Sequence, residues 1–94
     1  MSTEAVGAAN DQVRGARARD VLDFVAKSIV DDPDSVVIEM DEGRRGEVRL
    51  SLRVSPDDMG KVIGRRGRVA QAIRAVVRAA GAREGLEVGV DIVD

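Results

Sequence analysis

The residues with the clearest chemical potential are Gly64-Arg65-Arg66-Gly67, two arginines bracketed by two glycines. They lie in the stretch from Lys61 to Arg83, which carries seven Lys/Arg and no Asp or Glu, although the whole chain has a formal net charge of -2. Glycine permits positive φ and has no side chain, so an anionic ligand can approach the backbone closely. A helix that follows such a loop adds unpaired N–H groups and a partial positive charge at its first turn. The tetrapeptide therefore predicts contact with a sugar–phosphate backbone, and hence with single-stranded nucleic acid.

Further candidate side chains flank this loop, because helical spacing brings them toward it. Bases held beside the loop are expected to meet an aliphatic surface formed by Val62, Ile63 and Val69. The predicted binding residues are Lys61, Ile63, Gly64, Arg65, Arg66, Gly67, Arg68, Gln71 and Arg74. A glycine-bracketed turn is by itself common between helices, and a charge run is usually a solvated face. The acid-free run of seven cations centred on the turn favours binding.

Composition excludes several classes of function. The 94 residues fit one domain, and a single phenylalanine as the only aromatic residue predicts an aliphatic core. Cysteine and histidine are absent, which removes disulfides, thiolate–metal sites and the usual general base. No cofactor, metal or catalytic residue is predicted, and an enzyme is the least favoured class. No apolar run is long enough to span a bilayer and no secretory signal is recognisable, so we expect a cytoplasmic protein without a membrane partner.

Charge is distributed unevenly along the chain. Residues 1–43 carry four Lys/Arg and ten Asp/Glu, a net charge of -6, whereas residues 44–94 carry eleven and seven, a net charge of +4. Phosphates respond to the field within about 10 Å at ordinary salt, so the local excess matters more than the total.

The first half of the chain predicts a tail, a helix and a hairpin. Residues 1–18 lack apolar periodicity and are expected to form a mobile N-terminal tail, with the folded domain over 19–94. Asp20 is expected to cap a helix that ends at Asp31-Asp32-Pro33, whose acids should be solvated rather than bind a cation. Residues 36–40 and 48–54 predict two antiparallel strands joined by the glycine-bracketed turn 42–46.

The second half predicts two helices and a strand. Ser55-Pro56-Asp57-Asp58 is typical of a helix start with a Ser cap, and Gly64 ends that short helix. A second helix over about 68–80 ends at a Gly81 cap, and residues 86–92 alternate as a last strand. The expected buried stripe of the helix over about 68–80 is Val69, Ala72, Ile73, Val76, Val77 and Ala80. The order α-β-β-α-α-β predicts an α+β fold, a three-stranded mixed sheet with helices on one face.

These features together resemble a known family. Val62-Ile63-Gly64-Arg65-Arg66-Gly67 resembles the Ile-Gly-x-x-Gly core of the KH (K-homology) domain, and the element order resembles its type II form. The run from Ser55 to Gly64, followed by Gly67-Arg68 and Ala72-Ile73-Arg74, is similar to small single-KH RNA-binding proteins of bacteria (the KhpA kind). The resemblance covers residues 18–94 and leaves the preceding tail unmatched.

The resemblance implies a non-enzymatic RNA-binding protein whose Gly-x-x-Gly loop grips the backbone of about four nucleotides. It implies a groove formed by the two helices, the last strand and the loop near Gly81–Gly85. It also implies an RNA chaperone or post-transcriptional regulator linked to cell elongation and division (cell shape), which acts as a homodimer or as a heterodimer with a larger KH-containing bacterial protein. Base-stacking aromatics, worth about 1–3 kcal/mol per base elsewhere, are missing, so weak affinity is expected.

Two alternatives remain open at this stage. The chain can serve mainly as a dimerisation or docking subunit, through the wet faces of the sheet or the Met59–Gly60 region. It can also bind single-stranded DNA, because a backbone clamp does not by itself require a 2′-hydroxyl. As for catalysis, Asp57 and Asp58 are adjacent and point to different sides of a helix, which suits helix capping better than acid–base chemistry.

Overall fold

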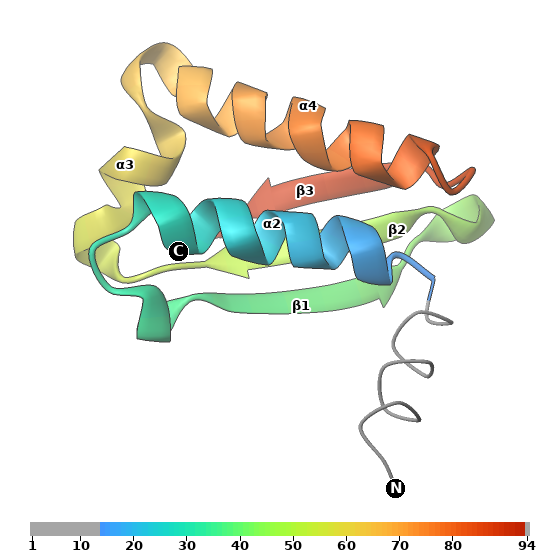
Figure 1. Ribbon diagram of the computed structural model, residues 1–94, viewed down its shortest axis with the longest axis horizontal. Coiled ribbons are helices and arrows are strands. Elements are labelled where there is room, and N and C mark those ends of the chain that lie inside the picture. Colours follow the sequence, from blue (N-terminus) through green and yellow to red (C-terminus); the bar gives the residue numbers. More distant parts are fainter. Residues whose placement is uncertain (1–13, 94) are drawn as a thin grey trace, which may run out of the picture.

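The computed structural model describes residues 14–93. Its helices are α2 (Ala16–Ile29), α3 (Met59–Ile63) and α4 (Arg68–Ala82), and its strands are β1 (Val37–Glu42), β2 (Val48–Arg53) and β3 (Val88–Ile92) (Figure 1). Short 3₁₀ turns precede β1, join β1 to β2, and begin α3 and α4. The predicted order α-β-β-α-α-β is confirmed. Most of the predicted tail, residues 1–13, lies outside the described residues.

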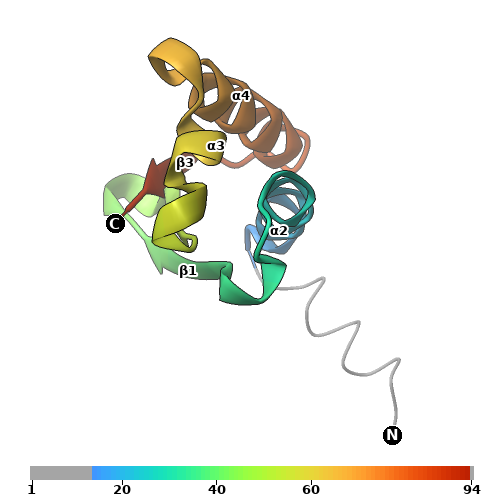
Figure 2. The ribbon, with the colours of Figure 1, turned by 90° about the vertical axis from the view of Figure 1, so that its left-hand side faces the viewer.

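The three strands form one mixed sheet in the order β1-β2-β3. β1 and β2 are antiparallel, with Val37 opposite Arg53, and β2 and β3 are parallel, with Val48 opposite Val88. Helices α2 and α4 lie side by side on one face of this sheet (Figures 1 and 2). The predicted α+β class, with helices on one face, is confirmed. Within residues 14–93, β1 and β3 are the two edges of the sheet, so one side of the β3 backbone has no strand beside it.

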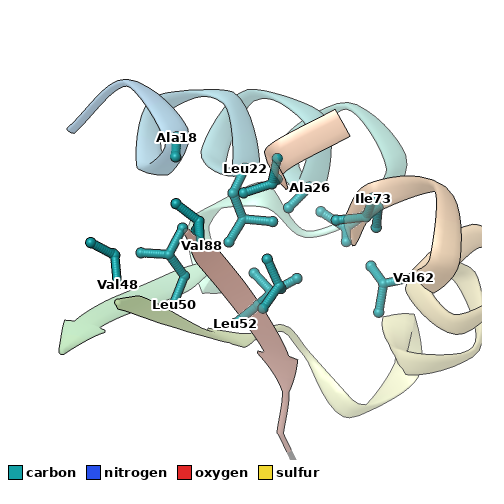
Figure 3. Close-up of a cluster of buried hydrophobic side chains, with 12 residues drawn as sticks. Ala18, Leu22, Ala26, Val48, Leu50, Leu52, Val62, Ile73 and Val88 are labelled. Atoms are coloured by element: carbon teal, nitrogen blue, oxygen red, sulfur yellow. The ribbon is translucent and has the colours of Figure 1, made fainter. Parts of the chain in front are cut away.

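The core between the sheet and the helices is aliphatic, as composition predicts (Figure 3). Its largest fully buried apolar side chains come from α2, β2, α3 and α4: Leu22, Leu50, Leu52, Val62 and Val77. The small side chains Ala18 and Ala26 allow α2 to lie close to its neighbours. Phe24 is 72% exposed, so the only aromatic residue contributes little to the core.

The start of α2 was predicted wrongly. The helix begins at Ala16, four residues before the expected cap at Asp20, and Gly15 precedes it with φ 84°. A Cβ on Gly15 would lie 2.9 Å from Val48 Cγ1, so the backbone at the start of the helix packs closely against β2. Ala18, assigned to the tail from sequence, is buried in the core. Tertiary packing, which no local pattern reports, therefore extends the helix toward its N-terminus.

The buried stripe of α4 also differs from the prediction. Ala70, Ile73, Val77 and Gly81 are buried, whereas Ala72 is exposed and Val76 is 49% exposed. Gly81 is not the C-terminal cap, because the helix continues to Ala82. A Cβ on Gly81 would lie 2.4 Å from Val88 Cγ2, so glycine here permits close approach of α4 to β3. The left-handed turn residue is Gly85, with φ 73°.

Candidate nucleic-acid interface

The Gly64–Gly67 loop is a single 3₁₀ turn, Arg65–Gly67, between α3 and α4. Gly64 has φ 75° and ψ 175°, a conformation almost confined to glycine. A Cβ there would lie 2.3 Å from Val69 Cγ2 and 2.9 Å from the Val69 backbone nitrogen. Arg66 is held at φ 55° and Gly67 at φ 73°, both in the left-handed region. The chain therefore reverses between the two helices by a route that requires glycine at Gly64.

This loop presents open, positively charged surface. Arg65, Arg66 and Arg68 are all exposed, and a Cβ on Gly67 would meet nothing within 4 Å. Among residues 14–93, no side chain caps the N-terminus of α4, and its first turn carries no acid. The Gly67 N–H donates to the Gly64 carbonyl at 3.2 Å and the Arg68 N–H to the Arg65 carbonyl, so these two donors are already used within the turn. An anion can still approach the positive end of the α4 dipole at Gly67, where three guanidinium groups lie nearby.

Helix α3 is held in place by Asp58, which is 2% exposed. Its carboxylate accepts hydrogen bonds from the backbone N–H groups of Asp31 (3.2 Å) and Asp32 (3.1 Å), just beyond the end of α2. The expected Ser55 side-chain cap is absent from the described structure, and the Asp58 N–H instead donates to the Ser55 carbonyl at 2.8 Å. Asp58 therefore fixes α3, and with it the loop, to the end of α2.

Lys61 is placed beside the loop, as predicted, but it already has a partner. Its Nζ lies 2.6 Å from Asp31 Oδ2 and 3.7 Å from Asp58 Oδ1. The hydrogen bond that Lys61 donates to Asp31, together with the negative charge of Asp31, raises the pKa of the Lys61 ammonium, and Asp58 adds to this effect. Asp31, expected to be simply solvated, thus competes with any phosphate for Lys61. Nucleic acid would have to share or replace this exposed ion pair.

The predicted residues of α4 lie along the helix face toward the free edge of β3. Arg74 defines this direction, because its Nε donates to the Val90 carbonyl at 3.1 Å. Gln71 and Arg78 lie one turn to either side of Arg74 and are exposed. The loop, the start of α4 and the β3 edge therefore form one continuous region of surface.

The expected aliphatic surface for bases is only partly present. Val62 is fully buried in the core and was wrongly included. Ile63 is 39% exposed, and Val69 is half-buried beneath Gly64. All nine predicted binding residues nevertheless fall in one segment, from the end of α3 through the first two turns of α4. Asp58 is the positioning residue that sequence reasoning missed, because its partners are 26 and 27 residues away.

Residues 14–93 contain neither a metal-binding cluster nor a membrane-spanning helix. No group of three or more His, Cys, Asp or Glu side chains in that range is arranged to hold a metal ion. None of the helices there combines the length and apolar character that crossing a bilayer requires.

Comparison with known proteins identifies the family of this chain. The family model described as "KhpA/KhpB, KH domain" matches residues 19–92. The chain belongs to the KhpA/KhpB KH-domain family. It is 52% identical over 75 residues to the RNA-binding protein KhpA of Streptomyces coelicolor, an alignment that covers 80% of this chain and 90% of that one. It is 45% identical over 75 residues to the RNA-binding protein KhpA of Clostridium acetobutylicum, covering 80% and 99%.

A solved structure shares the fold of this chain. A variant of Aquifex aeolicus Era bound to GDP·AlF4− superposes with a TM-score of 0.57 at 19% sequence identity. The match covers 81% of this chain but 30% of the Era chain. The type II KH prediction made from the Gly-x-x-Gly loop and the element order is thus confirmed at the level of family and fold.

Proposed function

We propose that this KH protein binds single-stranded RNA through the Gly64–Gly67 loop and acts without catalysis. The observation that carries the proposal is an open, uncapped, acid-free cationic turn at the start of α4 in a chain of this family. The naming of its relatives as RNA-binding proteins supports the choice of ligand.

The proposed contact begins with the backbone of the strand. Phosphate oxygens lie beside Gly67 and the first turn of α4, where the helix dipole favours negative charge. The dipole and the arginines carry this contact, because the Gly67 and Arg68 N–H groups already donate to the carbonyls of Gly64 and Arg65. Arg65, Arg66 and Arg68 add charge-assisted contacts to neighbouring phosphates. Because Gly67 carries no Cβ, the sugar–phosphate backbone can pass close to the peptide there.

Bases in this arrangement face Ile63 and the side of α4 that carries Gln71 and Arg74. The side of β3 that has no neighbouring strand offers further backbone donors and acceptors to base edges, apart from the Val90 carbonyl, which accepts from Arg74. The single aromatic residue, Phe24, lies on α2, so no stacking platform adjoins the loop. We therefore propose modest affinity and low sequence selectivity, which suits an RNA chaperone or post-transcriptional regulator in the cytoplasm with a role in cell elongation and division.

The test compares two variants of equal charge change. R65Q/R66Q removes two cations from the loop, whereas R19Q/K27Q removes two exposed cations from α2, where Lys27 pairs with Asp23 at 3.2 Å. Fluorescence anisotropy with a labelled oligouridylate should show a loss of about tenfold or more for R65Q/R66Q, and little change for R19Q/K27Q at matched salt. Circular dichroism should stay native for both. Normal binding by a folded R65Q/R66Q variant would overturn the proposal.

The choice between RNA and DNA is tested by competition. A 2′-hydroxyl can donate and accept hydrogen bonds, so the polar groups near the β3 edge can distinguish the two. We propose a preference for RNA. Equal displacement of a labelled oligoribonucleotide by deoxyribonucleotides of the same sequence would instead favour a general single-strand binder.

A second candidate role is self-association, or docking to a larger KH-containing protein. The observation that favours it is apolar surface on the helical layer: Phe24 is 72% and Val76 49% exposed, and Val76 lines a hollow with Val21, Ala79 and Ala80. Substituting V76D should convert a dimer to a monomer in light scattering, while R65Q/R66Q leaves association unchanged. A chain that is monomeric before any substitution would exclude the homodimer.

A further inference from the structure

The hairpin between β1 and β2 repeats the tetrapeptide of the binding loop. Gly43-Arg44-Arg45-Gly46 has the same four residues as Gly64-Arg65-Arg66-Gly67. It also forms a single 3₁₀ turn, Arg44–Gly46, and its second arginine is left-handed in the same way. Arg45 has φ 64° and ψ 18°, against 55° and 25° for Arg66, and the closing glycines have φ 79° and 73°. The two turns therefore hold their second arginine and closing glycine on similar backbone, whereas the first glycines differ, with φ -86° at Gly43 and 75° at Gly64.

Both arginines of the hairpin are available to a ligand. Arg44 and Arg45 are exposed, and neither makes an ion pair with another residue in the range 14–93. Two of the three nearest acids are engaged: Glu42 pairs with Arg14, and Glu47 has Oε2 3.7 Å from Arg49 Nη1. The third, Asp41, is exposed. Arg14 also donates to the Gly46 carbonyl at 2.8 Å, which anchors the turn to the start of α2.

The hairpin lies at the far end of α4 from the binding loop (Figure 1). The loop precedes α4, whereas the hairpin contacts the segment that follows it, through the Val48 N–H to the Glu87 carbonyl at 2.9 Å. Helix α4 has 15 residues and is therefore about 22 Å long. The exposed cations Arg78, on α4, and Arg83, directly after it, follow the loop toward the end of α4 that lies near the hairpin. They place positive charge in this direction, beside the exposed acids Glu84 and Glu87.

We propose that the hairpin Gly43–Gly46 is a second phosphate-backbone contact, which engages the same RNA strand only when that strand is long enough to run the length of α4. This inference rests on the proposed function of the Gly64–Gly67 loop. A stacked strand rises about 3.4 Å per nucleotide, so about six nucleotides span α4 beyond the roughly four gripped by the loop. Strands of about ten or more nucleotides reach the hairpin, and strands of about five do not.

The experiment measures affinity of the full chain for oligouridylates of about five and about twelve nucleotides. R44Q/R45Q should lower the affinity for the longer strand about tenfold and should reduce the log–log slope of that affinity against salt by about 1.4 in magnitude. The affinity of the same variant for the shorter strand should stay within about twofold of the unsubstituted chain. R19Q/K27Q is the control of matched charge change, and thermal melting checks the fold of each variant. An unchanged affinity for the longer strand, or an equal loss for both lengths, would overturn the hairpin site.

Two further readouts separate this proposal from the one on which it rests. R65Q/R66Q should lower the affinity for both strand lengths. If that variant binds both strands with unchanged affinity, the loop proposal is wrong, independently of the result for the hairpin variant. On the unmodified chain, amide resonances of Gly43–Gly46 should shift with the longer oligouridylate and not with the shorter. Resonances that stay still with both lengths would exclude the hairpin contact without any substitution.

Discussion

Replacing each glycine of the binding loop with alanine should destabilise the protein more at Gly64, which is tightly packed, than at Gly67, which faces open space. Gly64 adopts φ 75° and ψ 175°, which costs a non-glycine residue about 1–3 kcal/mol. Its new Cβ would also lie 2.3 Å from Val69 Cγ2 and 2.9 Å from the Val69 nitrogen, so α4 would have to shift. Gly67 has φ 73° and ψ 16°, where alanine costs about 1–2 kcal/mol, and its Cβ would meet nothing within 4 Å.

We therefore expect G64A to lower the free energy of unfolding by about 3 kcal/mol or more, and G67A by about 1 kcal/mol. Urea denaturation followed by circular dichroism measures both, and in a domain of this size each kcal/mol corresponds to a shift in Tm of about 4–8 °C. A loss of 3 kcal/mol is a large part of the total stability of a small domain. Equal losses for the two variants, or a larger loss for G67A, would refute the loop geometry described above.

The remaining predictions concern the supports of the loop and its electrostatics. D58N should lower the free energy of unfolding by about 1–3 kcal/mol in urea denaturation, because an amide has one oxygen to accept the two backbone N–H hydrogen bonds that the carboxylate accepts. D57N, at the exposed neighbouring position, is the control and should change the free energy of unfolding by less than about 0.5 kcal/mol. G81A should destabilise by about 1–3 kcal/mol despite the better helix propensity of alanine, because its Cβ would lie 2.4 Å from Val88 Cγ2; a stabilised variant in the same assay would contradict the close approach of α4 to β3. Oligoribonucleotide affinity should fall with salt with a log–log slope of about -2 to -3 if three or four phosphates are neutralised, and a flat titration would argue against backbone contacts. The affinity for RNA should be nearly constant between about pH 6 and pH 9, because the chain has no histidine and the pKa of Lys61 is raised above the ordinary lysine value. A titration midpoint of the affinity within that pH range would contradict this expectation.

Most of the fold could be predicted from local patterns. The alternation from Val48 to Val54 defined β2, and Gly64 correctly marked the end of α3. The Gly-x-x-Gly loop and its acid-free surroundings located the candidate site. These features are encoded in consecutive residues, which is why a single sequence reveals them.

Most of the wrong or missing predictions depend on contacts between distant segments. Ala18 belongs to α2 because it packs in the core, and Gly81 is required by Val88 rather than by a helix cap. Asp58 supports residues at the end of α2, and Asp31 holds Lys61 across 30 residues of sequence. The left-handed conformation of Arg66 follows from the short connection between two packed helices, and its residue type gives no indication of it.

The most direct test of the central claim is an amide NMR titration of the full chain with an oligoribonucleotide. If the turn at the start of α4 grips the RNA backbone, the N–H resonances of Gly64 through Arg68 should show the largest shifts, with smaller shifts along α4 toward Arg74. If RNA binds while these resonances stay unmoved, the strand lies elsewhere on the molecule and the proposed interface is wrong.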